Sequence, residues 1–172
     1  ENGGPGGLFH SLRIIPPILD ICKDIKDICP NSLLINFSNP MSRICLAIKR
    51  KFPSLKFVGL CHEFFFAIAH LPKILDKDIG DLDLKMGGLN HFGVLLDIRD
   101  KKTGKDLYPI VREKGLDYLD SLKSLDVDLI KYILEHYGYL PYTSDSHYGE
   151  YIHWAYEVAD LPGVRKFKEL YM

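Results

Sequence analysis

Cysteine and histidine stand at two points of the chain where a thiolate and an imidazole could bind one metal ion. Cys61 follows the short apolar run "LKFVGL", and His91 lies thirty residues later in "GGLNHFG", where glycines let backbone and ligand approach closely. These ligand types suit a first-row transition metal with water or substrate at the remaining positions. Since a lone cysteine is more often a packed core residue and a lone histidine a hydrogen-bonded one, the spacing alone is a weak signal.

A second stretch with chemical potential is "YGYLPYTSDSHYGEYIHW", residues 137–154, which holds five tyrosines, two histidines and the single tryptophan. Aromatic rings stack on the apolar faces of sugars, and Asp, Glu and His bind hydroxyl groups, so this composition favours a sugar site. An aromatic packing cluster or a subunit contact explains the same residues equally well.

The elements that would position these residues begin with a strand and helix alternation typical of an α/β fold. Isoleucines at three- and four-residue spacing predict an amphipathic helix that ends near Cys29. The apolar runs "SLLINF" (32–37) and "LKFVGL" (55–60) predict strands buried on both faces of a parallel sheet. Ligands bind beyond the carboxyl ends of such strands, where Asn39 and Cys61 fall, so we expect two strand ends to converge on one site.

Asn39 also has a purely structural explanation. Ser38 or Asn39 can cap the following helix, with Pro40 at its first position and an end near Lys51. Arg13 can likewise be a solvated charge on the first helix.

The later part of the chain changes character. The segment "LDLKMGGLNHFGVLLDIRDKKTGKDLYP" predicts antiparallel strands or a hairpin that turns at "DKKTGK". The pattern "VDLIKYILEHYG" predicts a helix that stops at Gly138, and "YLPYTSDSH" predicts a loop. A further helix is expected over "GEYIHWAYEVADL".

Composition narrows the function classes. The chain has 172 residues, 47% hydrophobic content and a net charge of −1, without a basic stripe that would favour nucleic acid. Its longest apolar stretch, "FFFAIA", is too short to span a bilayer, and the first residues lack the pattern of a signal peptide. We therefore expect a soluble, cytoplasmic protein with no nucleic-acid or membrane partner. Four cysteines without a CxxC pair predict reduced thiols, with Cys22, Cys29 and Cys45 as small core residues.

Six segments resemble glycoside hydrolase family 4 in order and spacing: "GGLFHSLRIIP", "INFSNPM", "VGLCHE", "GGLNHFG", "KDLYP" and "SDSHYGEYIHW". The resemblance covers nearly the whole chain and implies an α/β fold related to lactate and malate dehydrogenases. Residues 1–80 would be the C-terminal part of a Rossmann-like domain, and residues 81–172 an α+β region that binds substrate and metal. The family's amino-terminal strand and glycine-rich turn are missing, so we expect a fragment, or a chain completed by another, that binds NAD poorly alone.

The resemblance implies a glycosidase that uses NAD and a divalent metal, usually Mn²⁺, and departs from the two-carboxylate mechanism. In the family, NAD⁺ oxidises C3 of the sugar, the ketone acidifies the C2 proton, a base removes it, and the aglycone leaves from C1. A small-molecule glycoside is the expected partner, and we expect a homo-oligomer. The segments "CHE" and "SDSHYGEY" favour α-galactosides or α-galacturonides. The alternatives are a 6-phospho-α/β-glucosidase and a catalytically inactive binding fragment.

Carried over residue by residue, Cys61 in "GLCH" and His91 in "LNH" match the family's metal ligands. Asn39 in "SNP" matches an asparagine that contacts substrate, and Arg13 in "SLRIIP" falls in a segment that borders the site. His62 occupies a position where some members carry an acid proposed as the general acid.

The base is less directly matched, because family members diverge in the segment that reads "YLPYTSD" here. Tyr142 is our first candidate, with Tyr139 and Asp145 as alternatives. His147 and Glu150 would belong to the substrate loop, and no residue is assigned to NAD.

Overall fold

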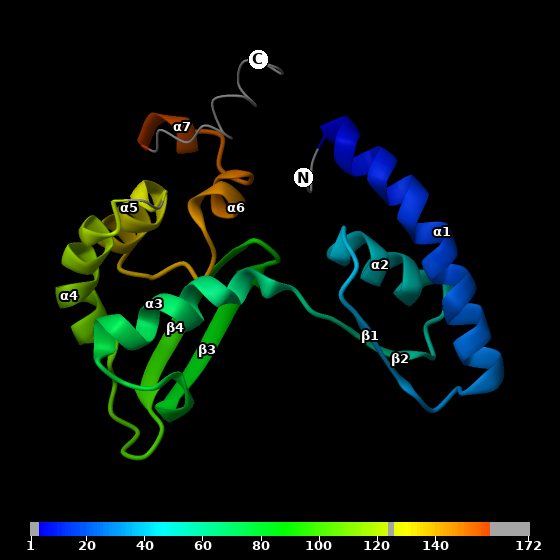
Figure 1. The fold of residues 1–172 in the computed structure, drawn as a ribbon, viewed down its shortest axis with the longest axis horizontal. Helices are drawn as coiled ribbons and strands as arrows, with labels where there is room; N and C mark the ends of the chain where they lie inside the picture. Colours follow the sequence, from blue (N-terminus) through cyan, green and yellow to red (C-terminus); the bar gives the residue numbers. More distant parts are fainter. Residues whose placement is uncertain (1–3, 124–125, 159–172) are drawn as a thin grey trace. The chain divides into compact units, whose positions relative to one another are not determined.

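The computed structural model describes residues 4–123 and 126–158, and the chain divides between His62 and Glu63 into two compact units (Figure 1). Helix α3 (Phe65–Leu75) belongs to the second unit, because its Ala67 and Leu71 are buried in the core of that unit. The domain boundary expected at residue 80 stays a prediction.

The first unit alternates helices and strands as predicted. Its elements are α1 (Gly4–Ile28), β1 (Leu33–Asn36), α2 (Met41–Lys51) and β2 (Lys56–Gly59). The two strands pair in parallel, with Leu33 opposite Lys56, and α2 forms the connection between them. Residues of α1 and α2, among them Cys22, Ile44 and Ile48, form the core of this unit. The predicted end of the first helix near Cys29 is confirmed.

Three local predictions for the first unit are wrong. Cys29 is exposed rather than part of the core, because it follows the last residue of α1. Pro40 takes the position before α2, and no side chain caps this helix, so neither Ser38 nor Asn39 has the predicted capping role. The strands are covered on one face only in the described part of the unit. Alternate residues point to opposite faces, and Leu33 and Ile35 are 60% and 51% exposed.

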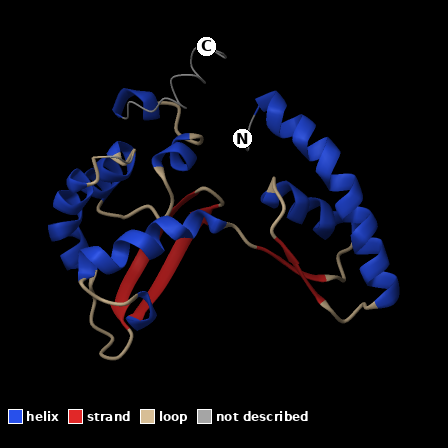
Figure 2. Ribbon diagram, in the orientation of Figure 1, coloured by secondary structure: helices blue, strands red, loops and turns tan. Residues whose placement is uncertain are grey.

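A hairpin and the helices around it form the second unit, whose strand pair Figure 2 shows in red beside α3 and α4. Its elements are η1 (His62–Phe64), α3, η2 (Ile79–Asp81), β3 (Leu82–Leu89), β4 (Phe92–Asp100), α4 (Tyr108–Ser121), α5 (Asp128–Tyr137), α6 (Asp145–Gly149) and α7 (Ala155–Val158). Buried residues of the hairpin, such as Leu95 and Ile98, pack with Leu71 of α3 and Val111 of α4. The hairpin therefore has one face against helices.

The antiparallel pairing is confirmed, but the predicted position of its turn is wrong. The chain reverses at Asn90 and His91, between Leu89 and Phe92. The "DKKTGK" segment makes the next turn instead, where the Asp100 carboxylate accepts hydrogen bonds from the backbone N–H groups of the turn.

The helical predictions for the last part hold in part. Helix α5 ends at Gly138, which has a φ of 70°, as its glycine stop predicts. Of the helix expected over "GEYIHWAYEVADL" (149–161), Ala155–Val158 is helical, Gly149 is the last residue of α6, and residues 150–154 are not helical. Residues 159–161 of that prediction lie outside the described residues. Across residues 4–123 and 126–158, we find no helix with the length and apolar character that crossing a membrane requires.

Candidate functional site

The turn of the β3–β4 hairpin carries His91 and is held by a carboxylate from the segment before α3. Glu63 accepts a hydrogen bond of 2.7 Å from Asn90 Nδ2 and another from the backbone N–H of His91. His91 has a φ of 66°, a left-handed conformation that is uncommon outside glycine. The carboxylate thus contacts a residue with a left-handed backbone conformation.

The imidazole of His91 meets two side chains from α6 and the residue after it. His91 Nδ1 lies 3.8 Å from a Glu150 carboxylate oxygen, and the His147 ring lies edge-on at 4.4 Å between ring centroids. Ser144 Oγ lies 2.8 Å from His147 Nδ1, which orients that second ring. Burial acts to raise the pKa of the Glu150 carboxyl, whereas the nearby His91 imidazole acts to lower it. His91 of the hairpin turn, His147 of α6 and Glu150 directly after α6 form a polar cluster.

Cys61 joins this region through the chain itself, because it precedes Glu63 by two residues. Two peptide units reach about 7 Å at most, so the thiol stays near the Glu63 backbone. Ligand atoms of Glu63 and His91 lie within 4.8 Å of each other, and with Cys61 they provide carboxylate, imidazole and thiol groups. This donor set suits a divalent transition metal.

Tyr142 lies at the base of the same turn. Its hydroxyl donates a 3.3 Å hydrogen bond to the carbonyl of Leu89, two residues before His91, and its ring packs edge-on against Phe64. The alternative base Tyr139 instead contacts the ring of Tyr108. Tyr142 is therefore the candidate base that the structure brings to the His91 turn.

Asp145, the other alternative, has the contacts of a helix cap. It is fully buried, and its two carboxylate oxygens accept hydrogen bonds of 2.7 and 2.9 Å from the backbone N–H groups of Leu129 and Ile130 at the start of α5. Burial raises its pKa to about 7, although the two N–H donors act in the opposite direction. Because Asp145 is fully buried at the start of α5, Tyr142 stays our candidate for the base.

The remaining predicted site residues lie in the first unit, whose last residue, His62, is also the first residue of η1. Asn39 is exposed and follows β1, Arg13 is exposed on α1, and His62 is exposed at the start of η1. A different arginine, Arg43 of α2, contacts α1: its guanidinium donates a 3.0 Å hydrogen bond to Ser11 Oγ. The roles expected for Asn39, Arg13 and His62 stay predictions.

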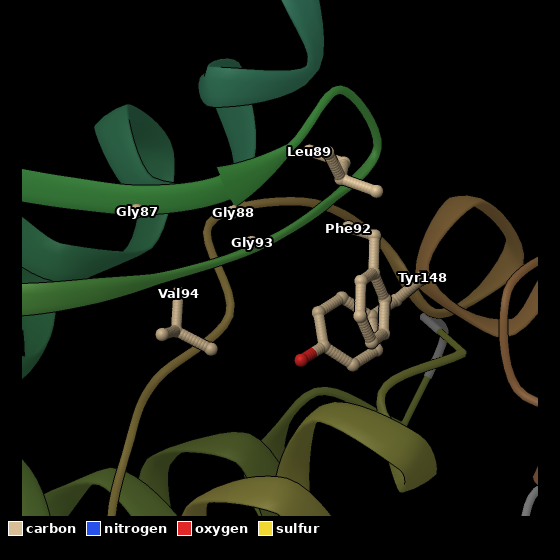
Figure 3. Close-up of a pocket in the computed structure, with 7 residues that line it drawn as sticks. All are labelled: Gly87, Gly88, Leu89, Phe92, Gly93, Val94 and Tyr148. Carbon is tan, nitrogen blue, oxygen red and sulfur yellow. The ribbon is translucent and has the colours of Figure 1, made fainter.

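An open apolar pocket of about 420 Å³ is lined by residues adjacent in sequence to this polar cluster (Figure 3). Its lining includes Phe92 and Tyr148, the residues that directly follow His91 and His147. Their rings lie 4.7 Å apart, and Tyr151 stacks on Phe92 at 5.6 Å. The tyrosines were noted in the sequence as sugar-site candidates, but Phe92 and Glu63 were missed. The signal for Glu63 was a carboxylate two residues after the candidate metal cysteine.

Both halves of this chain match known proteins of one family. Residues 1–77 match the description "Family 4 glycosyl hydrolase", and residues 86–169 match "Family 4 glycosyl hydrolase C-terminal domain". The chain is 48% identical over 206 aligned positions to an alpha-glucosidase of Erwinia rhapontici, covering 99% of this chain and 46% of that protein. It is 33% identical over 152 positions to an alpha-galactosidase of Bacillus subtilis, covering 88% of this chain and 34% of that protein.

The chain also resembles a solved structure in its fold. The 6-phospho-alpha-glucosidase from gut microorganisms, solved in complex with NAD and Mn²⁺, has a TM-score of 0.69 and 26% identity, covering 91% of this chain and 38% of that one. The chain thus spans less than half the length of these relatives. The parallel β1–β2 pair and this likeness confirm the predicted α/β, Rossmann-like fold class. Sequence and structure agree on one conclusion: the chain belongs to glycoside hydrolase family 4.

Proposed function

We propose that the protein to which this chain belongs is a glycosidase that uses NAD and Mn²⁺, oxidising its substrate at C3, removing the C2 proton and eliminating the aglycone from C1. One observation carries this proposal. The His91 imidazole stands in a turn held by Glu63, and Cys61 precedes Glu63 by two residues, so that metal-ligand types gather at one place. A hydrolase that relies on two carboxylates has no need of such a group.

The donor set fits the metal. Cys61 and His91 would hold it, because they match the family's metal ligands, while Glu63 accepts two hydrogen bonds from the turn. When bound, Mn²⁺ supplies Lewis acidity for the negative charge that develops next to C2, and NAD supplies the hydride acceptor for C3. Glu150 lies beside His91 Nδ1, in the position of a carboxylate that orients a ligating histidine.

The chain's own side chains have separate tasks in this scheme. Tyr142, at the base of the turn, takes the C2 proton after its hydroxyl has lost its own proton, so that the base is the phenolate. The exposed His62, next to Cys61 and protonated to the imidazolium, gives a proton to the leaving oxygen. Asn39, Arg13 and His147 contact sugar hydroxyl groups, and the Phe92–Tyr148 ring pair lies beside His147.

For the sugar, we propose an α-galactoside or α-galacturonide, on the strength of "CHE" and "SDSHYGEY". The α-glucoside is a second candidate, because the relative with 48% identity is described as an alpha-glucosidase. A 6-phospho-glucoside is a third candidate, since a solved relative is a 6-phospho-alpha-glucosidase.

The test uses the full-length protein, treated with chelator and dialysed under reducing conditions. Hydrolysis of p-nitrophenyl α-glucoside, α-galactoside, α-galacturonide and 6-phospho-α-glucoside is measured with NAD⁺, with Mn²⁺, with both and with neither. We expect turnover of one sugar class only when both are added. In D₂O, the released sugar should carry deuterium at C2, because the base removes that proton.

Turnover without NAD⁺, or a product that keeps its protium at C2, would contradict the mechanism. Oxidation of lactate or malate without metal would point to a dehydrogenase of the related fold. Metal binding without turnover of any glycoside would favour a binding role.

A further inference from the structure

We propose that Glu63 is a positioning residue, whose carboxylate clamps the β3–β4 turn and so connects the two segments that carry the candidate metal ligands. The clamp itself is a feature of the described residues. Its effect on metal binding rests on the function proposed above.

The geometry of the clamp involves both carboxylate oxygens. One accepts the 2.7 Å hydrogen bond from Asn90 Nδ2, and the other accepts from the backbone N–H of His91. Hydrogen bonds to an ionised group are stronger than neutral ones, so two of them on adjacent residues restrain the turn considerably. The restrained residue is His91, with its φ of 66°.

Glu63 is itself firmly anchored. It lies in η1, which leads into α3, and Ala67 and Leu71 of α3 are fully buried in the core of the second unit. A carboxylate on such a base can hold a surface turn in place. Cys61 is covalently two residues away, so the same clamp restrains the start of the segment that carries the thiol.

Removal of Asn90 distinguishes a clamp from a third metal ligand. Each Glu63 oxygen accepts one hydrogen bond from the turn, and Asn90 donates one of the two. Asn90 belongs to the clamp, but its side-chain amide is not a group that transition metals prefer as a ligand. Its removal should therefore loosen the turn without removing a ligand.

The experiment compares Glu63→Gln, Asn90→Ala and the matched control Glu113→Gln, an exposed glutamate of α4. Hydrogen–deuterium exchange of the full-length, metal-free protein is followed for the peptide that spans residues 89–92. We expect exchange of the turn to rise about tenfold or more in Glu63→Gln and Asn90→Ala, and to stay unchanged in Glu113→Gln. Calorimetric titration with Mn²⁺ should show the first two variants binding about 10- to 100-fold more weakly.

Unchanged exchange in both clamp variants would overturn the proposal. Weaker Mn²⁺ binding in Glu63→Gln with normal binding in Asn90→Ala would make Glu63 a ligand, which also overturns it. Faster exchange with unchanged Mn²⁺ affinity would refute the positioning role. If the wild type binds no Mn²⁺, the proposed function fails, and the exchange result still decides whether the clamp exists.

Discussion

The Tyr142 ring packs directly against the backbone of Gly93 in β4. A Cβ atom on Gly93 would lie 2.3 Å from the Tyr142 hydroxyl oxygen and 2.5 Å from its Cε1, far inside contact distance. Tyr142 is only 8% exposed, so its ring is held on this strand by neighbours on other sides as well. The ring of Tyr142, the proposed base, can therefore lie here only because Gly93 has no side chain.

Replacing Gly93 by alanine should displace the Tyr142 ring. Overpacking of this kind costs about 1–3 kcal/mol, and we expect the free energy of unfolding to fall by that amount. Because the hydroxyl leaves its position at Leu89, kcat should fall by more than KM rises. Urea unfolding and steady-state kinetics check both effects. Gly80→Ala is the matched control, since a Cβ there meets nothing within 4 Å; equal behaviour of the two variants would contradict the account.

Tyr142→Phe tests the base without changing the ring packing. General-base catalysis contributes about 10²–10⁴-fold, so kcat should fall within that range while the melting temperature changes little. Tyr139→Phe, at the alternative position, should leave kcat nearly unchanged. Full activity in Tyr142→Phe together with a large loss in Tyr139→Phe would transfer the role to Tyr139.

The predictions that succeeded depend on local periodicity. The isoleucine spacing correctly predicted the first helix, and two short apolar runs correctly predicted the parallel strands. Both patterns involve only residues that are close together in the sequence. The hairpin turn was misplaced because the reversal occurs at Asn90 and His91, with His91 at positive φ where glycine is usual. The "DKKTGK" segment, by contrast, has the composition of a turn and forms one, but after β4.

Roles for individual site residues could be predicted from the sequence only where the family resemblance assigned them. Glu63 contacts a turn 28 positions away in the chain, and no local pattern indicates such a contact. Asp145 looked chemically suitable as a base, but its use as the cap of α5 depends on tertiary packing. Contacts of this kind follow from the fold rather than from spacing.

Asp145 should make stability depend on pH. Its folded pKa of about 7 lies above the unfolded value, which is about 4, so folding takes up a proton between these pH values. The stabilising contribution is therefore fully present below about pH 4 and is lost as pH rises through about 7. Thermal unfolding of wild type and Asp145→Asn should show the wild type losing stability relative to the variant over this range. A constant difference would refute this, and Asp117→Asn, exposed on α4, serves as the control.

The most direct test of the central claim is Mn²⁺ affinity and glycoside turnover of full-length Cys61→Ser beside Cys29→Ser, an exposed cysteine outside the site. The account predicts that Cys61→Ser loses at least about 100-fold in both quantities, more than a residue outside the first coordination sphere usually costs. Cys29→Ser should match the wild type. Wild-type Mn²⁺ affinity and turnover in Cys61→Ser would contradict a metal site built on Cys61 and His91.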